Sequence, residues 1–145
     1  MVWKKLVNHS AALASRPKVL TTTFMCALSA TIRFASTGDE VAAQLKLSKF
    51  DQDDLYDPDT AILFGSQYLS SLFQQFPNQP EAVAASYNGG ADNMTRWMDR
   101  SRSKEPERYV PEIGFTQSKD YVYRVMSHFW SYERLYDAQL QPVSR

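Results

Sequence analysis

From Ser36 onward, apolar residues recur at intervals of about three and four positions, which is the period of amphipathic helices. The first predicted helix begins at Ser36 or Thr37, and the next two span Asp59 to Phe76 and Pro80 to Asn88. A fourth carries Met94, Trp97 and Met98 on one side, and the last extends from Ser118 to about Leu140. No pair of strand-like segments interrupts this series. The pattern therefore predicts an all-α domain.

Capping residues mark the first two helix starts. Ser36 and Thr37 each precede an acidic residue by three positions, so either can form a capping box. Asp57 precedes Pro58, and this order suits an N-cap followed by proline at the first helical position. These signals place two helix starts independently of the apolar period.

Glycines and charged residues mark the later boundaries. Gly89 and Gly90 end the third predicted helix, and Asp92 or Asn93 can cap the next one. Residues 99–114 are rich in charge and contain two prolines, so we expect a loop outside the core.

Composition limits the kind of partner. The 145 residues suit a single domain, and 43% apolar content predicts a folded chain. Sixteen basic and sixteen acidic residues cancel, so nothing indicates a nucleic-acid partner, and a neutral or weakly charged ligand fits better. The single Cys26 and the isolated His9 and His128 lack metal-ligand spacing. We expect a monomer with no metal and no cofactor.

The first 35 residues differ from the rest. Residues 19–32 carry no charge and follow several basic residues, which is the outline of an export signal too short to span a bilayer. The same segment could instead be a buried part of the domain, or the product of a shifted reading frame. We therefore divide the chain into a divergent segment, residues 1–35, and a helical domain, residues 36–140.

Several strings point to a known family when taken in order. The chain carries "LYDPDTAILFGSQYLSSLFQQF", then "EAVAASYNGG", then "IGFTQSKDYVYRV" with "FWSYERLY" behind it. Over residues 36–136 this series resembles the C-terminal part of the soluble lytic transglycosylase (SLT) domain, a lysozyme-like helical fold. The resemblance implies peptidoglycan glycan strands as the partner, cleavage of the MurNAc-GlcNAc bond to a 1,6-anhydro product, and, if the chain is exported, the bacterial periplasm or cell envelope.

The resemblance also implies which residues contact the glycan. The family's A-Y-N-A-G segment lies on the floor of the glycan groove, and a later tyrosine lies near the catalytic carboxyl. The matching residues, which we predict to bind substrate, are Ser86, Tyr87, Asn88, Gly89 and Tyr121. On the residues alone, Tyr87 could be a core residue, Asn88 a helix terminator and Tyr121 an ordinary interface residue.

The two tryptophans in the matched region have a simpler interpretation. Trp97 and Trp130 lie at helical spacing with other apolar residues. We therefore expect both in the core rather than along the groove.

The family's catalytic acid has no counterpart. The family uses one glutamate, first as general acid and then as base, in an E-S pair upstream of a G-L-M-Q run. Counting back the family's interval leads to Ala14-Ser15, and no Asp or Glu precedes Asp39. The family's E-T-R run is reduced to Gln117, Ser118 and Lys119.

The sequence therefore assigns no catalytic residue. Three functions remain open: a peptidoglycan lytic transglycosylase-like domain, a non-catalytic glycan-binding relative, and a plain helical interaction module.

Overall fold

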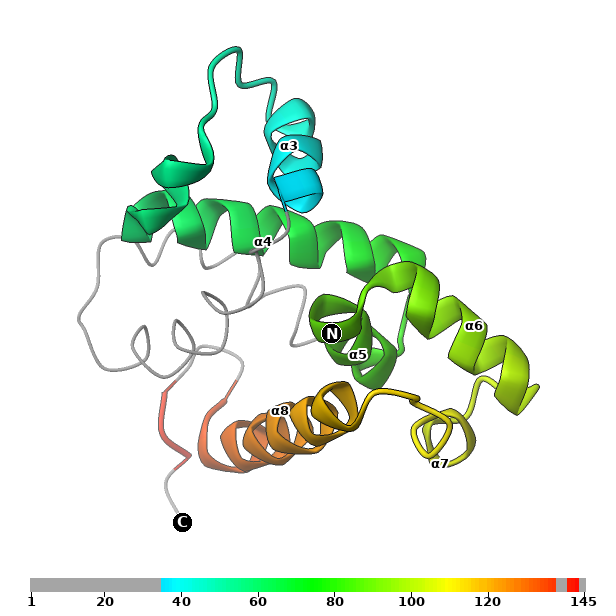
Figure 1. The fold of residues 1–145 in the computed structure, drawn as a ribbon. Helices are drawn as coiled ribbons and strands as arrows, with labels where there is room; N and C mark the ends of the chain where they lie inside the picture. The colour runs from blue at the N-terminus through cyan, green and yellow to red at the C-terminus, as the bar shows by residue number, and fades with distance from the viewer. Residues whose placement is uncertain (1–34, 138–140, 144–145) are drawn as a thin grey trace. The chain divides into compact units, whose positions relative to one another are not determined.

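A computed structural model of the chain describes residues 35–137 and 141–143 (Figure 1). Of the divergent segment predicted at residues 1–35, all but Ala35 lies outside the described residues. The helices are α3 (Ala35–Gln44), η1 (Gln52–Tyr56), α4 (Pro58–Gln75), α5 (Pro80–Gly89), α6 (Ala91–Ser101), α7 (Pro106–Tyr109) and α8 (Thr116–Leu135). In the described part the only β pairing is an isolated bridge between Tyr136 and Pro142. The all-α prediction is confirmed.

The described residues fall into two compact units, which divide between Ser71 and Leu72. The first unit contains α3, η1 and most of α4. The second contains α5 to α8, and the predicted binding residues all belong to it.

The N-cap predicted before α4 is confirmed. The Asp57 carboxylate accepts hydrogen bonds from the backbone nitrogen of Thr60 at 2.9 Å and from its hydroxyl at 2.8 Å. These bonds favour the charged carboxylate, so the pKa of Asp57 is lowered. Pro58 then occupies the first position of α4, where its missing N–H costs nothing.

The capping box predicted at Ser36 or Thr37 is wrong. Both residues lie within α3, which begins at Ala35. A capping box occurs instead at the start of η1, where the backbone nitrogen of Asp51 donates to Asp54 Oδ2 at 2.9 Å. Short polar side chains compete for backbone donors wherever the chain turns, and the loop before α4 offers more such donors than a continuing helix.

The first unit has an aromatic core. Phe64 of α4 is completely buried, and its ring stacks on Phe50 with centroids 4.8 Å apart. Val41 and Ala42 of α3 are buried in the same cluster, and Leu45, Leu55 and Tyr68 pack against it.

The second unit is built around α5. This helix packs against α8 and α6, and α6 packs against α7 (Figure 1). Residues 82–87 of α5 are all buried. The run of alanines explains how so short a helix can contact neighbours on several sides, because small side chains let helix axes approach closely.

The prediction of a polar loop at residues 99–114 is wrong in part. Helix α6 extends to Ser101, α7 follows, and Tyr109, Val110 and Ile113 are buried. These three residues are spaced as one face of a helical turn, and the high average charge of the segment concealed them.

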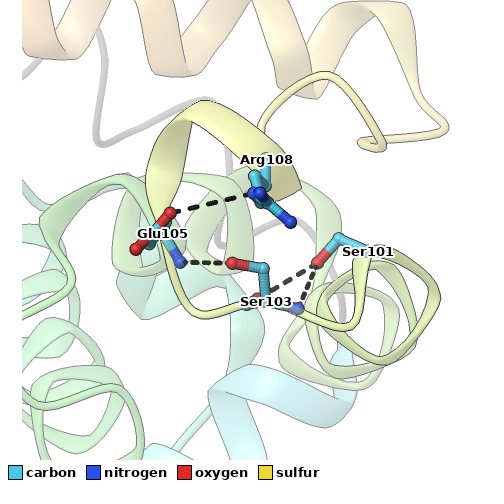
Figure 2. Close-up of polar contacts among 4 residues, drawn as sticks. All are labelled: Ser101, Ser103, Glu105 and Arg108. Atoms are coloured by element: carbon cyan, nitrogen blue, oxygen red, sulfur yellow. Dashed lines mark hydrogen bonds and ion pairs between the residues drawn. The ribbon is translucent and has the colours of Figure 1, made fainter.

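The charged residues of this segment are exposed except for Glu112, which is half-buried. Figure 2 shows the backbone nitrogen of Ser103 donating to Ser101 Oγ at 3.2 Å and that of Glu105 donating to Ser103 Oγ at 3.1 Å. Glu105 and Arg108 form an exposed ion pair at 3.8 Å. Serine hydroxyls therefore hold the turn between α6 and α7, and the exposed ion pair adds little.

Helix α8 differs from its predicted extent. It begins at Thr116, two residues before the predicted start, and ends at Leu135, so the predicted continuation to about Leu140 is wrong at Tyr136 and Asp137. Residues 138–140 lie outside the described residues. Trp97 is buried as predicted, but Trp130 is 56% exposed and does not belong to the core.

Replacing Phe64 tests the core of the first unit. We expect Phe64→Ala to lower the free energy of unfolding by about 3–5 kcal/mol, because it removes a fully buried ring and leaves a cavity. The neighbouring Leu63 is 50% exposed, so Leu63→Ala is a matched control that should change stability by well under half of that amount. Denaturant unfolding followed by circular dichroism gives both values, and equal losses would contradict this assignment of the core.

Candidate functional site

The predicted binding segment forms the end of α5 and its link to α6. The chain leaves the helix at Gly90, whose φ of +88° is a conformation that side-chain-bearing residues rarely adopt. The Gly90 nitrogen still donates to the Ser86 carbonyl at 2.8 Å, and the Gly90 carbonyl accepts from the nitrogen of Met94 at 3.1 Å. One glycine thus ends α5 and starts α6, which fixes the position of residues 86–89.

Asn88 is tied to a residue 30 positions away. The Ser118 hydroxyl of α8 donates to Asn88 Oδ1 at 2.9 Å. Ser118 is only 2% exposed, whereas Asn88 is half-buried. A buried hydroxyl that found no partner would destabilise the fold, so this bond helps to set the position of α5 against α8.

Gly89 is the point of closest approach between these elements. A Cβ atom at this position would lie 2.7 Å from Ser118 Oγ and 2.9 Å from Cη2 of Trp97. Both distances are shorter than real Cβ contacts, so the segment requires glycine here for space rather than only for ending the helix.

Asn93 has a different role from the N-cap predicted for it. Gly90 holds the cap position of α6, and Asn93 lies in the first turn. Its side-chain nitrogen donates back to the Gly89 carbonyl at 2.6 Å, and Asn93 Oδ1 accepts from Arg96 at 2.6 Å. The Asn93 amide therefore satisfies a carbonyl at the end of α5.

Trp97 packs against the turn between α5 and α6. Its indole lies against Gly89, and a Cβ at Gly114 would come within 3.0 Å of the indole nitrogen. Phe115 packs edge-on against the same indole, with ring centroids 5.2 Å apart. The large side chain of Trp97 thus fills the space that two glycines leave open.

Ser86 and Tyr87 lie deeper than Asn88. Tyr87 is 3% exposed and Ser86 is fully buried, and Ser86 Oγ has no hydrogen-bond partner among the residues that the structure describes. A buried hydroxyl without a partner costs free energy, which makes Ser86 unusual in this segment. That these two residues bind a ligand stays a prediction.

Tyr121 lies on α8 three residues after Ser118, so both side chains point to a similar side of the helix. Burial of the phenol raises the pKa of Tyr121 to about 12, and the nearby Arg124 acts in the opposite direction. The structure thus brings Ser86, Tyr87, Asn88 and Gly89 together, with Ser118 of α8 against them. The contact of Tyr121 with a ligand stays a prediction.

Carboxyl groups in the described residues lie near the surface. None of the Asp or Glu side chains whose burial is described is fully buried; Glu81 and Glu112 are half-buried and the others are exposed. Glu81 lies in the first turn of α5, where its carboxylate adds to the effect of burial in raising the pKa of Tyr109 of α7.

Ser118 is the site residue that reasoning from the sequence missed. The only indication in the sequence was that Ser118 lies in the run that replaces the family's E-T-R. That replacement suggested the loss of a family motif, not a serine hydroxyl that contacts the site. A bond across 30 residues leaves no trace in local periodicity.

The described residues lack two further features. No cluster of three or more His, Cys, Asp or Glu side chains there could hold a metal ion. In the same residues, no helix is both long and apolar enough to cross a membrane.

Comparison with known proteins identifies relatives of this chain. The transglycosylase SLT domain family matches residues 34–110. A candidate soluble lytic murein transglycosylase of Haemophilus influenzae is 31% identical over 101 residues, which are 69% of this chain and 17% of the relative. The soluble lytic murein transglycosylase of Escherichia coli K12 is 32% identical over 75 residues, or 51% of this chain and 12% of the relative.

That of Salmonella typhimurium is 31% identical over 75 residues, with the same coverage. This chain therefore spans less than a fifth of the length of these relatives. No solved structure matches the chain.

The hydroxyl of Ser86, which has no partner within residues 35–137, gives a stability prediction. We expect Ser86→Ala to raise the free energy of unfolding by about 1 kcal/mol, because it removes a buried polar atom and leaves the packing nearly unchanged. Thermal and denaturant unfolding measure the change. A loss of stability instead would mean that the hydroxyl has a partner in the folded protein.

Ionisation of Tyr121 gives a prediction for alkaline pH. Between about pH 10 and 12 the unfolded chain loses the Tyr121 proton while the folded chain keeps it, so the free energy of unfolding falls as pH rises. Tyr121→Phe should reduce this fall by up to about 1.4 kcal/mol per pH unit. Tyr123 is 57% exposed on the same helix, and Tyr123→Phe should leave the slope of the parent protein unchanged. Denaturant unfolding at several alkaline pH values measures the slopes, and identical slopes for the two variants would refute the prediction.

Proposed function

Because the chain belongs to the transglycosylase SLT domain family, we propose that its lysozyme-like domain binds peptidoglycan glycan strands at the end of α5. The ligand contacts would come from Asn88, Tyr87 and Tyr121, with the backbone of Ser86 and Gly89 forming the support. The glycan strand is the proposed partner because murein is the substrate that the relatives' names state.

One observation carries this proposal. Asn88 is half-buried and held through its Oδ1 by Ser118, on a turn that Gly89 and Trp97 keep close to α8. A site that recognises sugars needs polar groups fixed in place beside apolar surface, since a mobile amide would lose conformational entropy when a ligand binds. Here the amide is fixed before any ligand arrives.

Cleavage of the glycan is a separate question. A lytic transglycosylase needs one carboxyl whose pKa is raised by burial, so that it protonates the leaving oxygen and then removes the proton of the sugar's own 6-hydroxyl. No Asp or Glu precedes Asp39 in this sequence, and the described carboxyl groups lie at or near the surface. We therefore propose glycan binding without efficient cleavage by this chain.

The proposed ligand also suggests a location. Peptidoglycan lies in the bacterial cell envelope, so a chain that binds it must reach that compartment. The uncharged run at residues 19–32 is the part of the sequence that fits an export signal. We propose the periplasm or cell envelope as the site of action.

Incubation of the protein with purified sacculi tests the proposal. We expect the protein to sediment with the sacculi and to release no anhydro-muropeptides detectable by mass spectrometry. Asn88→Ala should weaken sedimentation about fivefold, because it removes one hydrogen-bonding group. Gln74→Ala removes an exposed amide of α4 and should leave sedimentation unchanged.

Other outcomes distinguish the alternatives. Release of anhydro-muropeptides would show that a carboxyl group supplies the acid after all. Absence of sedimentation in a folded sample would refute glycan binding and would favour a helical interaction module.

A further inference from the structure

We propose that Ser118 is a positioning residue that holds the Asn88 amide with its nitrogen directed to the ligand, so that the site selects ligand groups that accept a hydrogen bond. The best such group on a glycan strand is the carbonyl oxygen of an N-acetyl substituent. This inference rests on the proposed function, because it specifies which chemical group that site recognises.

The hydrogen bond between the two side chains has a defined direction. The Ser118 hydroxyl has one proton and donates it to Asn88 Oδ1 at 2.9 Å. Because Ser118 is 2% exposed, water does not compete for this proton. The carboxamide oxygen of Asn88 is therefore occupied from the side of α8.

The backbone around this bond leaves little room for rearrangement. Gly89 lies so close to Ser118 and Trp97 that a single added carbon would overlap both. Asn93 donates to the Gly89 carbonyl at 2.6 Å, and Gly90 donates to the Ser86 carbonyl at 2.8 Å. The end of α5 is thus held on both sides of Asn88, and rotation of the carboxamide would cost the bond to Ser118.

The other end of the carboxamide has no partner among the described residues. Asn88 is half-buried, and its Nδ2 makes no hydrogen bond within the described part of the chain. A carboxamide nitrogen can only donate. A ligand that meets it must therefore supply an acceptor, and a carbonyl oxygen accepts without offering a competing donor, whereas a hydroxyl does both.

A ligand-free measurement tests the positioning role. In nuclear magnetic resonance spectra the Asn88 side-chain amide should be rigid in the parent protein and in Ser118→Thr, which keeps the hydroxyl, and mobile in Ser118→Ala. Ser127→Ala changes an exposed serine of the same helix and should leave the Asn88 signal unchanged. A signal equally rigid in Ser118→Ala would overturn the role of Ser118, whether or not any glycan binds.

A pair of sugars tests the choice of ligand group. The tetramer of N-acetylglucosamine offers N-acetyl carbonyls, and the tetramer of glucose replaces them with hydroxyls. Titration calorimetry should show that the parent protein prefers the first, and that Ser118→Ala reduces the ratio of the two affinities about fivefold. Ser118→Thr should restore the ratio, which a merely structural effect on folding would not do.

Asn88→Asp gives the sharpest discrimination. The aspartate can still accept the proton of Ser118, but it has no N–H to offer and it places an acceptor of negative charge where the donor was. We expect at least about fivefold weaker binding of the N-acetylglucosamine tetramer by the folded variant. Binding as tight as that of the parent would overturn the donor role of Asn88.

The two proposals fail in different ways. If the folded parent protein binds neither the tetramers nor sacculi, the proposed function is wrong, and the resonance of the Asn88 side chain still decides whether Ser118 fixes it. If the parent binds both tetramers equally, glycan binding stands and the selection of an acceptor group is wrong.

Discussion

The close approach of α5 to α8 is the constraint on which the candidate site depends. At Gly89 the two elements lie so near that no side-chain carbon fits, and the buried Ser118 hydroxyl reaches Asn88 across the contact. Trp97 occupies the remaining space below the turn. Close packing of this kind converts a short glycine-ended helix into a rigid support, because a shift of either element would create overlap on one side and a void on the other.

Local patterns in the sequence predicted much of the fold. The apolar period located α4 and α5 within a residue at each end, and Asp57-Pro58 marked the start of α4, because both signals depend on neighbours along the chain. The same reasoning failed where composition concealed spacing, as at Tyr109, Val110 and Ile113. It also failed at Trp130, since helical spacing says which residues share a face but not whether another element covers that face.

The candidate site was less predictable than the fold. Resemblance to a family indicated that Tyr87, Asn88 and Gly89 bind substrate. Without that resemblance, the same residues read only as an ordinary helix end. Their relation to Ser118, Asn93 and Trp97 depends on contacts between different helices. The chemistry of Asn88 follows from one of those long-range contacts, because Ser118 leaves the amide a donor.

The complete burial of the alanine-rich part of α5 has a consequence for how related sequences are interpreted. Residues 82–87 touch neighbours on several sides, so only small side chains fit at most of these positions, whatever the protein does. Large substitutions in this stretch would destabilise the fold even in a relative that no longer cleaves peptidoglycan. An alanine-rich stretch of this kind therefore indicates the fold. Whether a related protein cleaves peptidoglycan must be judged from the presence of the catalytic glutamate.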